Sequence, residues 1–335
     1  MVRILSSLLL TLVLAAPAWA DALGDLKAGT EAAEKGRYDD AITALTRALG
    51  AGTLSREDQV AALKARGNAY VAKGLMADAF SRRDEARQQI DKATADLTEA
   101  LRVKPDDADL LADRGYAYFM TAQYDLAVDD FDTALRRRRS AVVLMQRATT
   151  YRALGRYDAA LADYDAVLGM DLKDSGLERG DMVTERGYSA FLAGRFADAA
   201  DDFDKALTVG AAAHAGDVLW APYHVAWLHI ARRRAGQDDK QALAERAGKL
   251  DLEQWPGTLI AYFLGQRSVA DITSTGGHGM GRSRECNISF FVGQDSLIKG
   301  EQAAAERSLR RTLDVCNAHT INALAAAAEL KRLKK

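Results

Sequence analysis

The sequence predicts an all-α protein, an α-solenoid of stacked helical hairpins that ends in a helical C-terminal region. The first observation behind this is that blocks with the same order of residue types recur at nearly constant intervals, as in stacked repeat architectures. The second is that the chain of 335 residues contains 4 prolines, too few for the many turns of a large β-sandwich or barrel. Hydrophobic residues make up 48% and charged residues 27% of the chain, which is a globular composition.

The charge balance argues against two classes of partner. The formal net charge is −2 at pH 7, whereas proteins that bind nucleic acid or anionic membranes through general electrostatics carry a positive excess. We therefore expect no nucleic-acid partner. Beyond the N-terminal segment no apolar run is long enough to predict a transmembrane segment.

The first element, residues 1–20, has the pattern of a secretory signal peptide. Arg3 gives a positive start, residues 4–16 form an apolar stretch, and Ala18 and Ala20 fit a cleavage site between small residues. No cysteine follows the apolar stretch that could accept a lipid. The sequence therefore predicts a periplasmic or secreted protein that is soluble after cleavage, and an uncleaved anchor is the alternative.

The next element, residues 21–213, contains five repeats of one pattern. Each repeat has a small residue, a turn that starts seven residues later, and an aromatic or leucine side chain in its second half. The small residues are Gly29, Gly67, Gly115, Ala148 and Gly187, and the turns start at Gly36, Gly74, Ala122, Gly155 and Gly194. This pattern resembles the tetratricopeptide repeat (TPR), a helix–turn–helix unit of 34 residues. The resemblance implies that small side chains let the two helices of each hairpin approach closely.

The second repeat carries an insertion. The spacing from Gly67 to Gly115 exceeds the 34-residue repeat by 14 residues, and the stretch 77–100 contains no Gly or Pro. We expect a lengthened hairpin whose tip, near residues 77–92, projects from the solenoid. A solvated charged extension without a function of its own is equally compatible with this composition.

The last element, residues 214–335, continues as degenerate helical repeats. We expect a flexible Gly-rich loop near residues 273–282, then a last TPR-like hairpin with Gly293 and Gly300, and a terminal helix that covers the open end of the stack. Residues 320–333 form this terminal helix, and further helices are expected over 217–235, 241–250 and 258–265.

The two cysteines, Cys286 and Cys316, lie at opposite ends of the last predicted hairpin. The first helix of an antiparallel hairpin begins where the second ends, so the two sulfurs can meet. In an oxidising compartment we expect a disulfide between them, and two buried thiols are the alternative.

Several C-terminal segments are similar to the end of the NlpI-like bacterial periplasmic TPR proteins. They are Trp227–Gly236, Trp255-Pro256, Tyr262–Gly265, Arg284–Gly293 and Ala328–Arg332. The resemblance implies an adaptor that holds peptidoglycan hydrolases and a periplasmic protease.

Motifs for catalysis or metal binding are isolated. Ser296 and Lys299 fit an SxxK pattern, but its companion elements are missing and the segment lies in a repeat helix. The histidines are scattered, so no metal site is expected. The aspartates 129, 130, 132, 201, 202 and 204 lack a calcium-loop glycine, and we expect them on a solvated helix face. We expect no catalytic residues, no cofactor and no enzyme activity.

Candidate binding residues occupy the inner positions of the first helix in each repeat. Tyr116 and Phe119 hold the same positions in one repeat as Tyr188 and Phe191 in another, with Arg152 between them in sequence. Exposed aromatic residues with an arginine suit an extended or helical peptide. The predicted partner-binding residues are Lys64, Asn68, Tyr116, Phe119, Arg152, Tyr188 and Phe191. The alternative is that the C-terminal helices fold back and bury the aromatic pairs.

Two further charge patterns have alternative interpretations. Lys64 and Asn68 resemble the start of the carboxylate clamp of chaperone-binding TPR domains, but Asp113 at the next clamp position would repel a carboxylate. The basic clusters 136–139 and 232–234 end predicted helices. They either complement the helix dipoles or contact an acidic partner or a cell-wall polymer.

The sequence thus predicts a non-enzymatic periplasmic scaffold or adaptor that binds a protein or peptide in a concave groove, such as an envelope or cell-wall enzyme. A second hypothesis is an enzyme or glycan-binding module that uses residues 214–335, which hold Trp220, Trp227 and Trp255. A third is a homo-oligomer whose groove is occupied by a neighbouring subunit.

Overall fold

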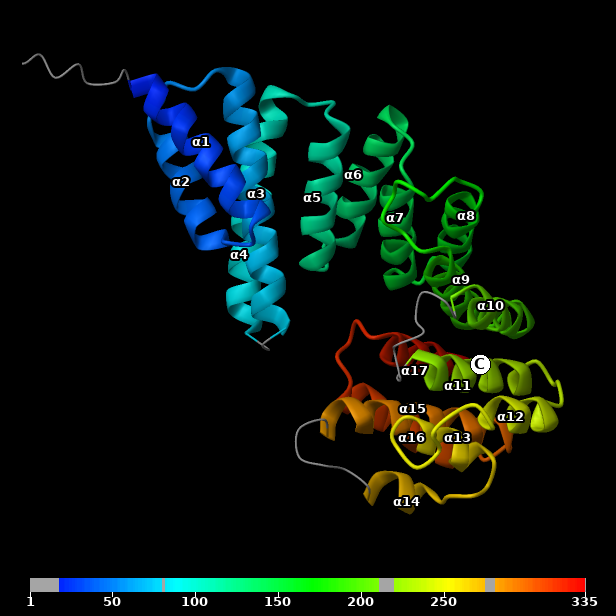
Figure 1. Cartoon of the computed structure of the whole chain (residues 1–335). Helices are drawn as coiled ribbons and strands as arrows, with labels where there is room; N and C mark the ends of the chain where they lie inside the picture. Colours follow the sequence, from blue (N-terminus) through cyan, green and yellow to red (C-terminus); the bar gives the residue numbers. More distant parts are fainter. Residues whose placement is uncertain (1–17, 80–81, 211–219, 275–280, 335) are drawn as a thin grey trace, which may run out of the picture. The chain divides into compact units, whose positions relative to one another are not determined.

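The computed structural model describes residues 18–79, 82–210, 220–274 and 281–334 (Figure 1). Over these ranges the chain is helical without a β-strand, which confirms the predicted all-α fold. Most of the predicted signal peptide, residues 1–17, and the middle of the predicted Gly-rich loop, residues 275–280, lie outside the described residues. None of the described helices is both long and apolar enough to cross a lipid bilayer. Contacts divide the chain into two compact units, residues 1–138 and 139–335.

The first unit consists of consecutive helical hairpins. Its helices are α1 (Ala18–Glu34), α2 (Tyr38–Gly50), α3 (Arg56–Ala79), α4 (Arg83–Val103), α5 (Ala108–Met120) and α6 (Tyr124–Arg137). Each odd-numbered helix packs against the next helix, and each hairpin packs against the following one. Helices α3 and α4 have 24 and 21 residues, against 13 and 14 in α5 and α6. The insertion therefore lengthens both helices of the second hairpin.

Small residues set the distance between the helices of each hairpin. A Cβ atom added to Gly115 would lie 2.8 Å from the ring of Phe131, and one added to Gly29 would lie 2.5 Å from Leu45. Phe131 and Leu45 are fully buried, so neither side chain can move aside without disturbing close packing. The small residues of the repeat are therefore required by the core of each hairpin.

The turn of the third hairpin contains an alanine in a glycine conformation. Ala122 has φ +60°, while the equivalent turn residue of the first hairpin, Gly36, has φ +71°. A left-handed backbone costs roughly 1–2 kcal/mol for a residue with a Cβ atom. Ala122→Gly is therefore expected to raise the free energy of unfolding of the first unit by about 1 kcal/mol, measured by urea unfolding followed by far-UV circular dichroism.

The matched control for this turn is Gly36→Ala. A Cβ atom there would meet no other atom within 4 Å, so the change tests backbone strain alone. We expect it to lower the free energy of unfolding by about 1 kcal/mol. An unchanged or lower urea midpoint for Ala122→Gly would show that the turn is not strained.

Four repeats share a bidentate arginine–aspartate pair that joins their two helices. The arginine precedes the small residue of the first helix and the aspartate precedes the bulky residue of the second helix. The pairs are Arg66–Asp96, Arg114–Asp130, Arg147–Asp163 and Arg186–Asp202. In the third repeat, Arg114 Nε and Nη2 donate to the Asp130 carboxylate over 2.7 and 2.8 Å. Asp130 and Asp202 are 7% and 5% exposed, so their predicted place on a solvated face is wrong.

The same arginines also link neighbouring repeats within a unit. Arg66 Nη1 donates to Thr46 Oγ1 over 3.1 Å, and Arg186 Nη1 donates to Asp165 Oδ1 over 2.6 Å. Each acceptor lies on the second helix of the preceding hairpin. Each guanidinium therefore connects three helices. Its five N–H donors in a planar fork let it bond to the aspartate of its own hairpin and to the preceding hairpin at the same time.

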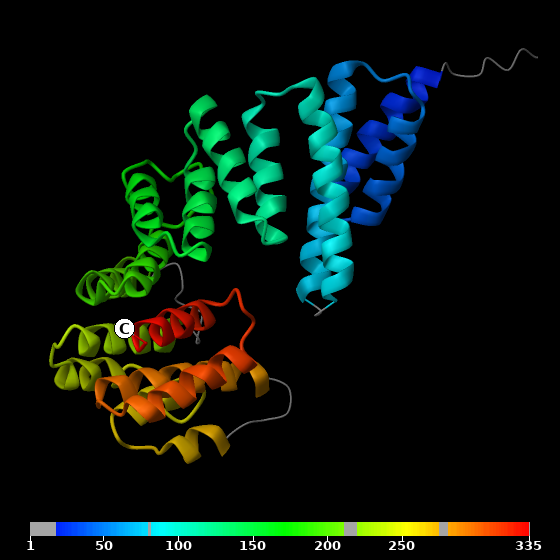
Figure 2. The same cartoon turned by 180° about the vertical axis from the view of Figure 1, so that it is seen from behind.

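The second unit begins with two hairpins and continues into the helices of the C-terminal region (Figures 1 and 2). The hairpin helices are α7 (Ala141–Ala153), α8 (Tyr157–Leu168), α9 (Arg179–Ala193) and α10 (Phe196–Val209). The C-terminal helices are α11 (Trp220–Arg234), α12 (Lys240–Ala247), α13 (Gly257–Phe263), α14 (Val269–Ser274), α15 (Gly281–Ile298), α16 (Gln302–Val315) and α17 (Ile321–Arg332).

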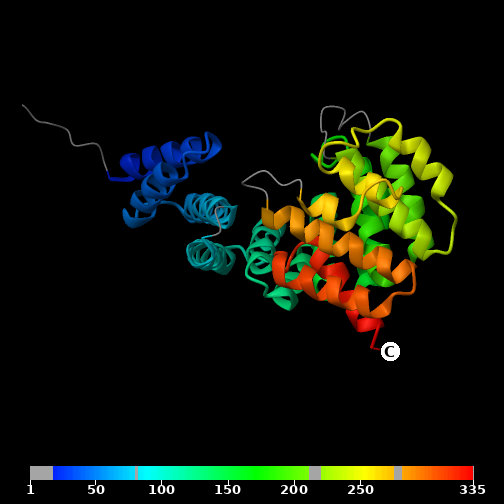
Figure 3. The same cartoon turned by 90° about the horizontal axis from the view of Figure 1, so that it is seen from below.

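The C-terminal helices fold back onto the fifth hairpin. Helix α11 packs against α10 and α15, and α17 packs against α9, α15 and α16; Figure 3 shows α15, α16 and α17 side by side in orange and red. Trp227 of α11 is 3% exposed and lies in one hydrophobic cluster with Phe191 and Phe290. The face of α9 that carries Phe191 is therefore buried in the hydrophobic core of the second unit.

The last hairpin contains the predicted disulfide. Cys286 of α15 and Cys316 at the end of α16 are bonded, with Cα atoms 5.0 Å apart. Both ends of the predicted flexible loop, residues 273–282, are corrected, because residues 273–274 belong to α14 and residues 281–282 belong to α15.

Helix α14 begins with a capping box. Ser268 N donates to Asp271 Oδ2 over 2.7 Å, and Asp271 N donates to Ser268 Oγ over 3.2 Å.

Candidate partner-binding surfaces

A polar and aromatic surface lies on the first helices of the second and third repeats. Asn68 Nδ2 of α3 donates to Asp113 Oδ2 of α5 over 3.2 Å, and Lys64 Nζ lies 3.7 Å from the same oxygen. Tyr116 and Phe119 follow Asp113 along α5. We call these five residues the inner patch. Four of the predicted partner-binding residues are thereby brought together within one unit.

The carboxylate of Asp113 determines the electrostatics of the inner patch. Burial raises the pKa of Asp113 above its usual value, although Lys64 and Asn68 act in the opposite direction. Lys64 and Asn68 are already engaged by this carboxylate. The arrangement cannot act as a clamp for a partner carboxylate, and it favours a neutral or basic partner group.

The aromatic part of the inner patch is half-buried. The rings of Tyr116 and Phe119 are stacked, with centroids 6.4 Å apart and planes 21° apart, and Phe119 lies 5.8 Å from Tyr124. Burial raises the pKa of Tyr116, which packs beside the core residue Val71. Rings held on one side by the core and open on the other provide rigid apolar contact area at low entropic cost.

The equivalent aromatic pair of the fifth repeat is not open. Phe191 is 0% exposed, and its ring meets Trp227 at a centroid distance of 5.2 Å. Tyr188 is partly buried and lies 5.0 Å from the Trp227 ring. The prediction that Phe191 contacts a partner is therefore wrong, because α11 occupies the space that a partner would need.

Arg152 is also a structural residue rather than an open contact. Its side chain is 10% exposed, and Nη1 donates to Glu185 Oε2 over 2.5 Å. Tyr164 is fully buried beside this pair, and burial raises the pKa of Tyr164 to about 12. The predicted role of Arg152 in partner binding is corrected accordingly, since its charge is used to join α7 to α9.

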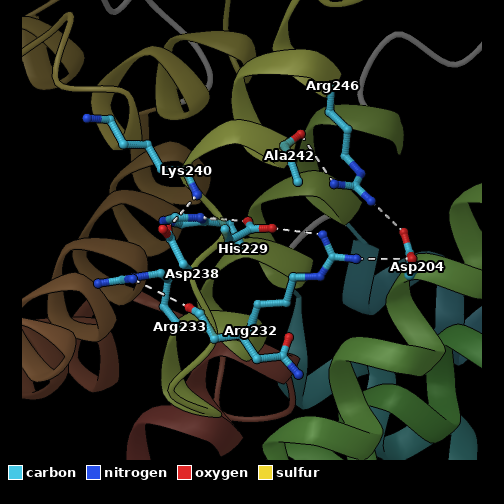
Figure 4. Close-up of polar contacts among 10 residues, drawn as sticks. Asp204, His229, Arg232, Arg233, Asp238, Lys240, Ala242 and Arg246 are labelled. Atoms are coloured by element: carbon cyan, nitrogen blue, oxygen red, sulfur yellow. Dashed lines mark hydrogen bonds and ion pairs between the residues drawn. The ribbon is translucent and has the colours of Figure 1, made fainter.

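The basic cluster at the end of α11 is bound within the protein (Figure 4). Arg232 Nη1 donates to Asp239 over 2.8 Å and Nη2 to Asp204 over 3.1 Å, and Arg246 also donates to Asp204. His229 Nδ1 lies 3.0 Å from Asp239. Burial alone would raise the pKa of Asp239, but hydrogen bonds from His229 and Arg232 outweigh it and hold that pKa below its usual value.

Arg234, Arg137 and Arg138 of the two basic clusters have partners as well. Arg234 donates to Gln294 over 2.8 Å and to Glu329 over 2.9 Å. In the first unit, Arg137 donates to Asp106 over 2.5 Å and Arg138 to Asp109. These contacts engage Arg234, Arg137 and Arg138 within the protein, and a contact of the clusters with an acidic partner stays a prediction.

An aromatic cavity, which sequence analysis did not locate, lies in the second unit. Its volume is about 470 Å³ and its walls include Trp220, Tyr223, Trp227, Trp255 and Arg284. The concentration of tryptophans after residue 214, on which the second hypothesis from the sequence rests, is the signal that indicates this region. Among the described residues, no three His, Cys, Asp or Glu side chains are grouped so that they could hold a metal ion.

The repeat family and the fold are shown by comparison with known proteins. A family model described as a tetratricopeptide repeat matches residues 26–82, 80–142 and 145–217, which is more than half of the chain. A solved tetratricopeptide repeat protein from Parabacteroides merdae ATCC 43184 is 14% identical, with 92% of this chain and 99% of that chain covered and a TM-score of 0.54. The crystal structure of MamA protein is 18% identical, with 59% and 96% covered and a TM-score of 0.47.

Proposed function

Because this chain belongs to the tetratricopeptide-repeat family, we propose that it is a non-enzymatic scaffold that binds a protein or peptide partner through its inner patch. Repeat proteins of this type use extended inner surfaces for binding. The observation that carries the proposal is the stacked and half-exposed pair Tyr116 and Phe119 beside Lys64, Asn68 and Asp113. Of the equivalent aromatic residues of the fifth repeat, Phe191 is fully buried and Tyr188 is partly buried against Trp227, so neither belongs to the inner patch.

The chemistry of the inner patch defines the partner segment. Stacked rings accept an apolar or aromatic side chain. The Asp113 carboxylate, which lies beside Lys64 and Asn68, accepts a hydrogen bond from an amide or from a basic side chain. An extended or helical peptide that presents an apolar residue close to a basic one meets both requirements.

This proposal is tested with Tyr116→Ala/Phe119→Ala in the mature chain. Each ring provides contact area that typically contributes 1–2 kcal/mol or more to binding, so the double variant is expected to weaken partner binding by more than about tenfold. Binding is measured by affinity capture from a periplasmic extract, followed by titration with the captured partner.

The matched control for this variant is Leu126→Ala. Leu126 is 46% exposed and lies on the second helix of the same hairpin, α6. The control is expected to bind like the unchanged protein. Equal capture by the double variant and the unchanged protein would refute the assignment of the inner patch.

We also propose that the protein is exported, either to the periplasm or outside the cell. Support comes from the pattern of residues 1–20 and from the disulfide between Cys286 and Cys316, since disulfides persist in oxidising compartments. Partners would then be envelope proteins, and the similarity of the C-terminal segments to NlpI-like proteins favours peptidoglycan hydrolases or a periplasmic protease.

Export is tested by cell fractionation and mass spectrometry of the purified protein. The mature protein is expected in the periplasmic or secreted fraction, with Asp21 as its first residue and a mass lower by 2 Da than that of the reduced chain. A chain that starts at Met1 in the cytoplasmic fraction would contradict this proposal.

A further inference from the structure

The aromatic cavity of the second unit has the size of a small-ligand site. It lies among α9, α11, α15 and the start of α17, helices that pack together in Figures 1 and 2. Its volume of about 470 Å³ falls within the roughly 300–1,000 Å³ typical of ligand pockets. Trp220, Tyr223, Trp227 and Trp255 contribute to its walls, so apolar surface dominates the interior.

The polar edge of the cavity presents hydrogen-bond donors. Trp255 Nε1 donates to the Tyr223 hydroxyl oxygen over 3.1 Å, so the Tyr223 hydroxyl can donate its own proton to a different acceptor. The Arg284 guanidinium lies over the same indole, 4.7 Å from the ring centroid. Arg284 and Tyr223 influence each other electrostatically. A cation and a phenolic donor therefore converge beside one aromatic wall.

The polar groups on the walls also have partners within the protein, and Arg284 Nη2 donates to the carbonyl oxygen of Ile272 over 2.7 Å. His224 Nδ1 lies 2.8 Å from the carbonyl oxygen of Trp220, and His224 Nε2 lies 3.1 Å from Thr184 Oγ1. Asn322 Nδ2 donates to Asn287 Oδ1 over 2.8 Å. The described wall residues include Arg284 but no aspartate or glutamate, so their formal charge is positive.

We propose that this cavity binds a small apolar molecule that carries one carboxylate. The aromatic walls bury the apolar part, and Arg284 and Tyr223 donate hydrogen bonds to the carboxylate. Aromatic cages also bind quaternary ammonium ions, but a guanidinium in the wall repels such a cation. The same chemistry occurs in a free aromatic carboxylate and in the C-terminal residue of a peptide, and the two sources are separated by the choice of probe.

The test uses the mature chain and three probes with one apolar body and different head groups. Hydrocinnamate carries a carboxylate, hydrocinnamamide is neutral and phenylpropylamine is a cation. Binding is followed by tryptophan fluorescence, because Trp220, Trp227 and Trp255 all line the cavity. Hydrocinnamate is expected to bind at least about tenfold more tightly than the amide, and the amine most weakly. Equal affinities for the three, or no saturable change with any of them, would overturn the proposal.

Variants separate the role of Arg284 from a general effect on the fold. Arg284→Gln is expected to remove the preference for the carboxylate while leaving the amide affinity within about twofold, and Arg284→Lys to restore part of the preference. The matched control is Arg310→Gln, since Arg310 is an exposed arginine of α16 outside the cavity walls. A head-group preference that persists in Arg284→Gln, or that is lost equally in Arg310→Gln, would contradict the assignment.

Peptide probes identify the source of the ligand. Acetyl-Ala-Ala-Phe is compared with its C-terminal amide and with hydrocinnamate. Tighter binding of the free-acid peptide than of hydrocinnamate supports a chain terminus as the ligand. Binding of hydrocinnamate but not of the peptide supports a free small carboxylate.

Discussion

Asp130→Ala is expected to lower the free energy of unfolding of the first unit by about 3–5 kcal/mol. The carboxylate is 7% exposed and accepts two hydrogen bonds from Arg114. Its removal leaves a largely buried guanidinium without its counter-charge, which is more costly than the loss of the pair's own attraction. Urea unfolding followed by far-UV circular dichroism measures the effect. Tryptophan fluorescence does not report on the first unit, because the tryptophans after residue 21 all lie in the second unit.

Two further variants show whether burial is the cause of this loss. Glu99→Ala removes the partner of Arg102 in a pair whose side chains are 44% and 72% exposed, and we expect a change below about 1 kcal/mol. Arg114→Met/Asp130→Leu replaces the buried pair by apolar side chains and is expected to be more stable than Asp130→Ala. Similar losses for Glu99→Ala and Asp130→Ala would show that the buried pair has no special role.

Cys286→Ala/Cys316→Ala is expected to lower the free energy of unfolding of the second unit by about 3–4 kcal/mol. The disulfide closes a loop with a sequence separation of 30, which restricts the unfolded chain. Tryptophan fluorescence during urea unfolding measures the effect, because Trp227 lies in the hydrophobic core of this unit.

Reductant provides the control for the disulfide prediction. It is expected to lower the urea midpoint of the unchanged protein to that of the double variant and to leave the variant unaffected. A double variant as stable as the oxidised protein would contradict the prediction, and so would an effect of reductant on the variant.

The helical hairpins could be predicted from the sequence because their determinants are local and repeated. Gly115 and Phe131 meet within one hairpin, so the two positions recur at fixed spacing in every copy. The arginine–aspartate pairs carry an equally regular signal. Arg114 and Asp130 immediately precede Gly115 and Phe131, and the same order recurs in three other repeats. The repeat pattern alone does not predict these pairs, because charged residues on a helix ordinarily face solvent.

The fate of the two aromatic pairs could not be predicted from the repeats alone. Phe119 and Phe191 hold equivalent positions, yet Phe119 is half-buried while Phe191 is fully buried. The difference comes from Trp227 of α11, a residue outside the regular repeats. Burial at these positions therefore depends on distant parts of the chain, and periodicity within one repeat carries no information about it.

Photo-crosslinking in cells tests most directly whether the inner patch binds a partner. A benzoylphenylalanine placed at Phe119 samples the inner patch, and one placed at the exposed Leu126 samples the second helix of the same hairpin. We predict a discrete crosslinked adduct with the probe at Phe119 and none with the probe at Leu126. An adduct at Leu126 alone, or no adduct at either position in cells that contain the protein, would contradict the proposed function.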